Sequence, residues 1–229
     1  MNELLPAIEV TTDGVPRFAV IWLHGLGADG GDFAPIVPEL EMPHGTGVRF
    51  VFPHAPDMPV TCNGGYIMPA WYDILSLSSD ARQVDEAGVC RSREAIRRLI
   101  ARENARGIPC ARIFLAGFSQ GGAVAYTTAL THGERLAGVI ALSTYLPVPA
   151  LVDAEATPAN RALPVFAAHG DADDVVSPML GAQARDFLLA RGYPVHWLTF
   201  PMPHSVCEEE IRAIGHWLRL QMAQPDGVA

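Results

Sequence analysis

One serine occupies a position where its hydroxyl could act as a nucleophile. Residues 117–121 read G-F-S-Q-G, with Ser119 in the middle. The apolar run at 112–116 predicts a strand, and the run of small residues at 122–130 predicts a helix. A sharp turn from strand to helix holds its middle residue strained and exposed, and the flanking glycines let the turn close without Cβ clashes. The pattern predicts a nucleophilic serine; the alternative is a glycine-rich turn that binds nothing.

A serine hydroxyl needs a base within hydrogen-bond reach, and that base needs a group that orients it. Imidazole suits the role of base because it changes protonation near neutral pH. His204 follows a predicted strand at 194–199, although a histidine on a surface loop would look the same. The carboxylate candidates follow a predicted strand at 164–169, where an aspartate is also a common turn residue. Spacing does not decide among these three candidates, which are Asp171, Asp173 and Asp174.

Two backbone N–H groups usually stabilise the negative charge that develops on the carbonyl oxygen during acyl transfer. One is expected from Gln120, directly after the predicted nucleophile. The other is expected from the glycine-rich stretch at 23–31, L-H-G-L-G-A-D-G-G, which follows a predicted strand at 17–23. The competing interpretation is a phosphate-binding loop. The chain has no lysine, which a phosphate-binding P-loop needs, and this disfavours that alternative.

The length of 229 residues fits one domain, 1–229, large enough to bury a core without disulfides. The longest apolar runs, such as 18–23, have the length of a strand and are too short to span a membrane. The first residues lack the basic and apolar segments of a signal peptide. We therefore expect a cytoplasmic protein without integral membrane contact, whose four cysteines are reduced; they are Cys62, Cys90, Cys110 and Cys207.

The charged residues exclude several classes of function. The net charge of −9 argues against nucleic acid and against attraction to anionic lipid. All 16 cationic side chains are arginine, so mechanisms that need a lysine are excluded. The acidic run at 208–210 suits the positive end of a helix better than a metal. Four histidines lack the spacing of a metal site, and we expect no metal; they are His44, His54, His132 and His216.

Strands and helices alternate along the chain, which predicts an α/β fold with a mostly parallel sheet and helices on both faces. The predicted strands lie at 17–23, 47–52, 112–117, 137–142, 164–169 and 194–199, with a weaker one at 7–12. The predicted helices lie at 32–40, 84–106, 120–131, 178–191 and 206–220.

The stretch 53–83 shows no clear periodicity and contains several prolines, glycines and aromatic residues. Long loops of this kind often cover a functional site, and we expect this one to lie over the site with some short strands. A packed surface excursion is the alternative. Residues 223–229 are predicted to form a flexible tail.

Taken together, seven segments resemble the carboxylesterase / acyl-protein thioesterase family of α/β-hydrolases, also called the phospholipase/carboxylesterase group. They occur in family order across residues 15–220, which makes the set specific. They are L-H-G-L-G at 23–27, P-H-A-P at 53–56, W-Y-D at 71–73, G-F-S-Q-G-G at 117–122, L-S-T-Y-L-P at 142–147, H-G-D-A-D at 169–173 and H-S at 204–205.

The resemblance implies a compact α/β-hydrolase fold without a large cap domain. The family's catalytic aspartate is the fifth residue of an H-G-x-x-D string, which falls on Asp173, while its nucleophile and base fall on Ser119 and His204. Its oxyanion-binding N–H groups fall on Leu26 and Gln120. The residues expected in its acyl pocket are Trp71, Leu75, Tyr145 and Val175. One departure is Pro203, where many relatives have glycine before the catalytic histidine; it narrows the freedom of that loop and leaves the base in place.

The function that this resemblance implies is hydrolysis of a small-molecule or lipid-like carboxylic ester through an acyl-enzyme, with no metal or organic cofactor. Two alternatives use the same three residues: an acyl-protein thioesterase and a lysophospholipase. A further alternative is a non-catalytic binding protein with the hydrolase fold. No nucleic-acid partner is expected. A homodimer is compatible with the sequence, which identifies no interface.

Overall fold

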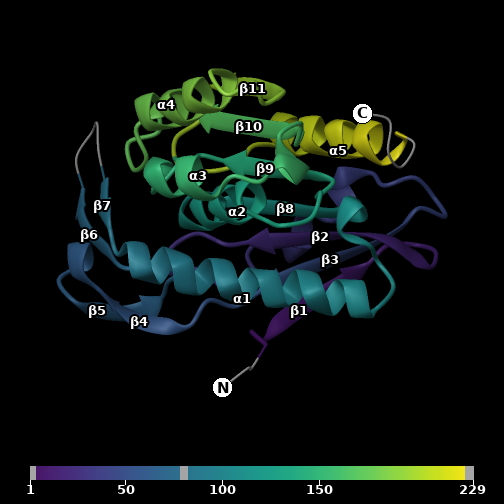
Figure 1. Cartoon of the computed structure of the whole chain (residues 1–229), viewed down its shortest axis with the longest axis horizontal. Helices are drawn as coiled ribbons and strands as arrows, with labels where there is room; N and C mark the ends of the chain where they lie inside the picture. Colours follow the sequence, from purple (N-terminus) through teal and green to yellow (C-terminus); the bar gives the residue numbers. More distant parts are fainter. Residues whose placement is uncertain (1–3, 78–81, 225–229) are drawn as a thin grey trace.

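A mostly parallel sheet forms the centre of the molecule, as predicted (Figure 1). The computed structural model describes residues 4–77 and 82–224, so residues 225–229 of the predicted tail lie outside its description. In the described part, the central sheet has seven strands in the order β1-β3-β2-β8-β9-β10-β11; β1 is antiparallel to β3 and the other pairs are parallel. These strands are β1 Ala7–Thr11, β2 Pro16–Leu23, β3 Gly47–Pro53, β8 Ile113–Phe118, β9 Gly138–Leu142, β10 Val165–Gly170 and β11 Val195–Phe200.

Every strand of this sheet begins and ends within one residue of its predicted bounds, including the weaker prediction at 7–12. The central strands β8, β9 and β10 are apolar and almost completely buried. Parallel strands covered by helices on both faces read as continuous apolar runs, which explains why the sequence predicts them well.

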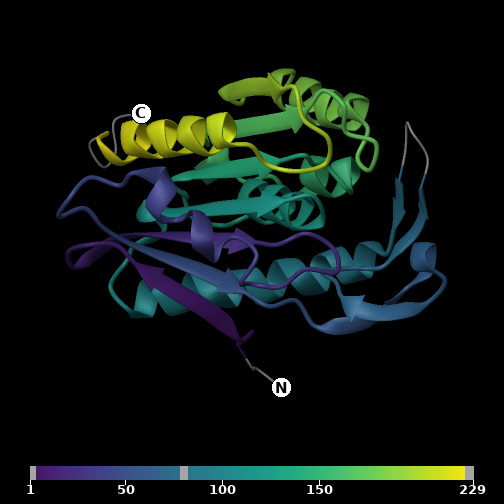
Figure 2. The ribbon, with the colours of Figure 1, turned by 180° about the vertical axis from the view of Figure 1, so that it is seen from behind.

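Helices cover both faces of the sheet (Figures 1 and 2). One face packs against α1 Glu86–Ala105, α2 Gln120–Leu130, α3 Pro149–Glu155 and α4 Pro178–Leu189. The other face packs against α5 Glu208–Met222 and two short 3-10 helices, η1 Ala34–Ile36 and η2 Pro38–Leu40. Among the described residues, no helix combines the length and apolar character needed to cross a bilayer.

Two helix predictions need correction. The segment predicted as one helix at 32–40 is instead the pair η1 and η2, each with a proline at one of its first two positions. Pro38 has no N–H to continue an α-helix and its ring clashes with the preceding turn, so the segment breaks into short 3-10 pieces. The seven-residue α3 was not predicted, because it is short and prolines at 147 and 149 read as a loop.

The stretch 53–83 forms two small antiparallel pairs, in agreement with the prediction of short strands. They are β4 Asp57–Val60 with β5 Tyr66–Pro69, and β6 Ile74–Leu77 with β7 Arg82–Val84; η3 Thr61–Asn63 lies within the first pair. Both pairs lie at the end of the molecule toward which β10 points (Figures 1 and 2). The stretch therefore stands at the carboxyl edge of the sheet, where open α/β sheets bind their ligands.

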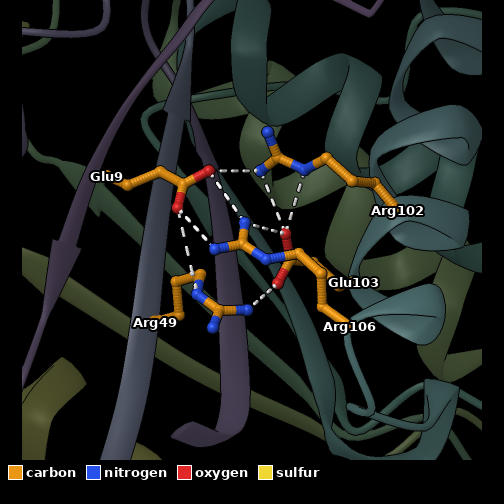
Figure 3. A network of polar contacts seen from close by, with 5 residues as sticks. All are labelled: Glu9, Arg49, Arg102, Glu103 and Arg106. Carbon is orange, nitrogen blue, oxygen red and sulfur yellow. Dashed lines mark hydrogen bonds and ion pairs between the residues drawn. The ribbon is translucent and has the colours of Figure 1, made fainter.

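An ionic network fixes the outer part of the sheet to α1 (Figure 3). The buried carboxylate of Glu103 on α1 pairs with Arg49 of β3 at 2.6 Å, and with Arg102 and Arg106 at 3.0 and 3.1 Å. Glu9 of the edge strand β1 pairs with Arg102 and Arg106, both at 2.9 Å. The hydrogen bond from Arg106 outweighs partial burial and lowers the pKa of Glu9. Because the network joins β1, β3 and α1, it holds an edge strand that is only partly buried.

Candidate active site

Ser119 lies in the turn between β8 and α2, with backbone angles φ 54° and ψ −122°. A positive φ is rare for a residue with a side chain and indicates local strain. The turn is held because the Ser119 N–H donates to Leu142 O at 2.9 Å and Thr144 Oγ1 donates to Ser119 O at 2.6 Å. A Cβ on Gly121 would lie 2.5 Å from the carbonyl oxygens of residues 23 and 24, so only glycine fits there. The geometry is that of a nucleophile elbow.

His204 and Asp173 come together from two different loops. Nδ1 of His204 lies 2.7 Å from Oδ2 of Asp173. The other carboxylate oxygen of Asp173 accepts hydrogen bonds from the N–H groups of Val175 and Val176, at 3.0 and 2.7 Å. The His204 ring also packs against Phe118, with 4.6 Å between ring centroids. The carboxylate is thus fixed by its own loop and can fix the imidazole in turn.

A second histidine supports the same carboxylate. Nε2 of His169 lies 2.8 Å from Val176 O and 3.4 Å from Asp173 Oδ2. Because a carbonyl oxygen only accepts, this nitrogen carries the proton. Burial alone would raise the pKa of Asp173, but hydrogen bonds from His169, His204 and the Val176 N–H outweigh it and hold the pKa well below its usual range. Asp173 is therefore an anion throughout the neutral range.

Asp173 differs clearly from the two aspartates beside it. Asp171 and Asp174 are exposed, while Asp173 is buried. Of the three, only Asp173 forms a hydrogen bond to His204 in the described part of the chain. The structure therefore separates candidates that the spacing left equivalent.

Ser119 and His204 line one cavity of about 320 Å³. No hydrogen bond joins the Ser119 hydroxyl to the His204 ring within the residues the structure describes. Such contacts are often long before substrate binds. Leu26 and Gln120 line the same cavity. Gln120 is the first residue of α2, so its N–H has no acceptor within the helix and is available to a ligand.

The loop that carries Leu26 is held by His24, which is almost completely buried. Nδ1 of His24 lies 2.7 Å from Gly25 O, and the N–H of Ala55 donates to Nε2 at 3.1 Å. Nδ1 must therefore carry the proton and Nε2 must be free of it. Burial lowers the pKa of His24, which agrees with a neutral ring. The histidine of the L-H-G-L-G segment thus has a structural role behind the loop.

The four expected acyl-pocket residues divide into two pairs. Tyr145 and Val175 line the cavity. Trp71 and Leu75 lie elsewhere, contrary to expectation. Trp71 is only 2% exposed, and its indole N–H donates to His24 O at 2.9 Å, so it packs beneath the loop that carries Leu26. Leu75 is 46% exposed and does not line the cavity, at a point where the register of β6 against β7 shifts between Ile74 and Ser76.

Several cavity residues were not identified from the sequence. Leu77 and Arg82 line it from the two strands β6 and β7, beside Ile74. The guanidinium of Arg82 lies 5.4 Å from the centre of the Tyr145 ring and donates to Val175 O. The stretch 53–83 has no periodic pattern, so no sequence signal indicated which of its side chains face inward. The prediction that it lies over the site agrees with these positions.

The fold and the elbow define an α/β-hydrolase, with no large cap domain in the described residues. A family model described as Phospholipase/Carboxylesterase matches residues 7–222, and the chain belongs to this family.

Relatives and solved structures agree with this assignment. Acyl-protein thioesterase 1 of Neurospora crassa is 44% identical over 208 residues, which cover 87% of this chain and 84% of the relative. A probable carboxylesterase of Oryza sativa is 36% identical, over 95% of this chain and 82% of the relative. The crystal structure of Zea mays acyl-protein thioesterase 2 superposes with a TM-score of 0.83 at 27% identity, covering 95% of this chain and 99% of that one.

Proposed function

We propose that the chain hydrolyses carboxylic esters through an acyl-enzyme formed on Ser119. The observation that carries the proposal is that Ser119 and His204 line the same cavity. Ser119 lies in a strained strand-to-helix turn, and Nδ1 of His204 lies 2.7 Å from the carboxylate of Asp173. Esterase or thioesterase activity also agrees with the names of the relatives.

The reaction proceeds in two halves. The Ser119 Oγ attacks the ester carbonyl while Nε2 of His204 takes its proton, and the N–H groups of Leu26 and Gln120 stabilise the oxyanion. The tetrahedral intermediate collapses, His204 protonates the leaving alcohol, and the acyl group stays on Ser119. Water then attacks the acyl-enzyme with His204 as base, which releases the acid and restores the serine. Asp173 stabilises the imidazolium in both halves.

Thioester hydrolysis is the second candidate function, because relatives at 44% and 42% identity are named acyl-protein thioesterase 1. Ser119, His204 and Asp173 could cleave a thioester by the same two half-reactions, with a thiolate in place of the alcohol as the leaving group. Ile74 and Leu77 of β6 line the cavity, and the half-exposed side chain of Leu77 offers apolar surface that suits an acyl chain. An acyl-length series offered as esters and as thioesters, side by side, distinguishes the two candidates by their kcat/KM.

The proposal is tested with Ser119→Ala, using Ser76→Ala as the control because Ser76 is exposed on β6. We expect Ser119→Ala to abolish turnover of a short p-nitrophenyl ester and labelling by a fluorophosphonate, with an unchanged melting temperature. The control should keep both activities. Turnover that survives in Ser119→Ala refutes the proposal. A wild-type chain that neither turns over esters nor reacts with the fluorophosphonate supports the non-catalytic binding protein instead.

A further inference from the structure

Three potential metal ligands meet at the end of the molecule opposite the candidate active site. Cys110 lies in the short helix η4 Cys110–Arg112, directly before β8, while His132 and Glu134 follow the end of α2. One ligand atom from each of the three lies within 4.8 Å of the other two. Because β8 and α2 run away from Ser119, the far end of β8 is about 20 Å and the far end of α2 about 17 Å from the nucleophile.

The distance between the first two ligands fits a zinc ion. Sγ of Cys110 lies 3.6 Å from Nε2 of His132. With Zn–S and Zn–N bonds of about 2.3 and 2.05 Å, a tetrahedral angle puts sulfur and nitrogen about 3.6 Å apart. Thiolate, imidazole and carboxylate are ligands that Zn²⁺ accepts, and the two negative charges of Cys110 and Glu134 would balance the ion.

Hydrogen bonds hold the ligands in place before any ion arrives. The buried amide of Asn160 donates to His132 O at 2.9 Å and to Glu134 O at 2.8 Å, so it fixes the backbone of both ligands. The Asn104 amide, near the end of α1, donates to Cys110 Sγ at 3.1 Å. Burial raises the pKa of the Cys110 thiol, and this donor offsets part of that effect. A hydrogen bond of this kind also orients a metal ligand.

Two further features set the expected strength of binding. Arg97 carries a positive charge near His132, but its guanidinium is engaged by Glu94 at 2.6 Å and by the carbonyl of Thr131. Nδ1 of His132 is buried and has no hydrogen-bond partner in the described part of the chain. A metal-bound histidine usually has such a partner, and its loss typically weakens binding about 10- to 100-fold. Binding should therefore be weaker than at a closed four-ligand zinc site.

We propose that Cys110, His132 and Glu134 form a Zn²⁺ site, with water as the fourth ligand. Binding replaces the thiol proton of Cys110 by the metal, and that proton goes to solvent. The ion would join the segment before β8 to the segment after α2, and so close the strand–turn–helix unit that carries Ser119 at its other end. The expected consequence is added stability, independent of the proposed hydrolase function.

The test uses the untagged chain freed of metal with a chelator. Co²⁺ is the probe because a cobalt–thiolate bond gives a charge-transfer absorption in the near ultraviolet. We expect about one equivalent of Co²⁺ to produce this band, and Zn²⁺ to displace it and raise the melting temperature. The band should be absent in Cys110→Ala and kept in Cys207→Ala, a matched control because Cys207 is also a free thiol.

Glu134→Gln is the second variant, because Glu134 is exposed and its replacement should leave the fold intact. It should weaken Co²⁺ binding by about 10-fold or more, because loss of a direct ligand should cost at least as much as loss of a group that only supports one. The proposal is overturned if the wild type shows no thiolate band, if the band survives in Cys110→Ala, or if Glu134→Gln binds as tightly as the wild type. In the first case, the contact between Cys110 and His132 is an ordinary S–H···N hydrogen bond.

Discussion

The side-chain carbonyl of Gln120 accepts a hydrogen bond of 2.8 Å from the backbone N–H of Trp71. The amide nitrogen of the same side chain donates to Tyr72 O at 2.7 Å. The residue whose N–H is proposed to bind the oxyanion therefore also fixes, through its side chain, the segment that leads into β6. One side-chain amide therefore fixes the position of the segment before β6 relative to the turn that carries Ser119.

Replacing Gln120 by methionine should loosen the attachment of the segment before β6 to α2, because methionine keeps the length of the side chain but makes neither hydrogen bond. A buried polar group left unsatisfied costs about 1–3 kcal/mol, and two such groups remain, on Trp71 and Tyr72. We expect a lower free energy of unfolding by about 2 kcal/mol or more in urea, and a kcat/KM reduced at least about 10-fold. Gln183→Met on α4 is the control, because that side chain is exposed. Unchanged stability in Gln120→Met would contradict the prediction.

Much of this arrangement could be predicted because parallel strands end at one edge. Ser119, His204 and the aspartates each follow a different apolar strand, so topology alone brings them to one side. Spacing could not choose among the aspartates, since all follow β10. The choice depends on which carboxylate the N–H groups of Val175 and Val176 hold in a buried position.

The spacing of residues in the sequence could not predict contacts between distant segments. Cys110 and His132 are 22 residues apart, and they meet only because α2 folds back along β8. The family resemblance alone predicted Trp71 as a pocket residue, but its indole N–H donates a hydrogen bond to His24 O, which keeps the side chain buried. A buried tryptophan usually satisfies that donor, and here the acceptor belongs to a loop 47 residues earlier in the chain.

Asp173→Asn should reduce activity far more than the same change at the two neighbouring aspartates. The amide is close in size to the carboxylate but does not stabilise an imidazolium, and it favours the wrong tautomer of His204. We expect kcat to fall about 10³- to 10⁴-fold, by analogy with the same change in serine proteases. Asp171→Asn and Asp174→Asn are matched controls, exposed and one or two residues away, and should keep nearly full activity. Equal losses in all three variants would contradict the assignment.

Glu103→Gln should destabilise the fold without changing the chemistry. The substitution leaves Arg49, Arg102 and Arg106 with Glu9 as the remaining carboxylate of the network (Figure 3). Breaking a buried ion pair by neutralising one partner typically costs about 3–5 kcal/mol, and we expect a loss near the lower end because several of the arginines keep Glu9. Urea unfolding measures the loss, while kcat/KM at room temperature should stay within about twofold of wild type.

The control for this variant is Glu94→Gln on the same helix. Glu94 pairs with Arg97 at 2.6 Å, but its side chain is half exposed. Exposed pairs contribute about 0–1 kcal/mol, so the control should be almost as stable as the wild type. If both variants lose the same stability, the buried network does not anchor β1 and β3 as inferred.

Glu210 should make the stability depend on pH. Its side chain is completely buried in the first turn of α5, and neither carboxyl oxygen has a hydrogen-bond partner in the part of the chain described. Burial raises the pKa of Glu210 to about 8. Above a pH of about 4.5 the unfolded chain loses this proton while the folded chain keeps it up to about pH 8. In that window the folded state binds more protons, so its stability decreases as pH rises.

Glu210→Gln should remove this dependence, because the amide does not ionise and its carbonyl can still face the start of the helix. Below a pH of about 4.5 the variant and the wild type should be similarly stable, and above about pH 8 the variant should be more stable by a few kcal/mol. Thermal unfolding across this range measures the difference. Glu209→Gln, one residue away and exposed, should show no such divergence. A difference between Glu210→Gln and the wild type that stays constant with pH would mean that Glu210 does not change its protonation in this window.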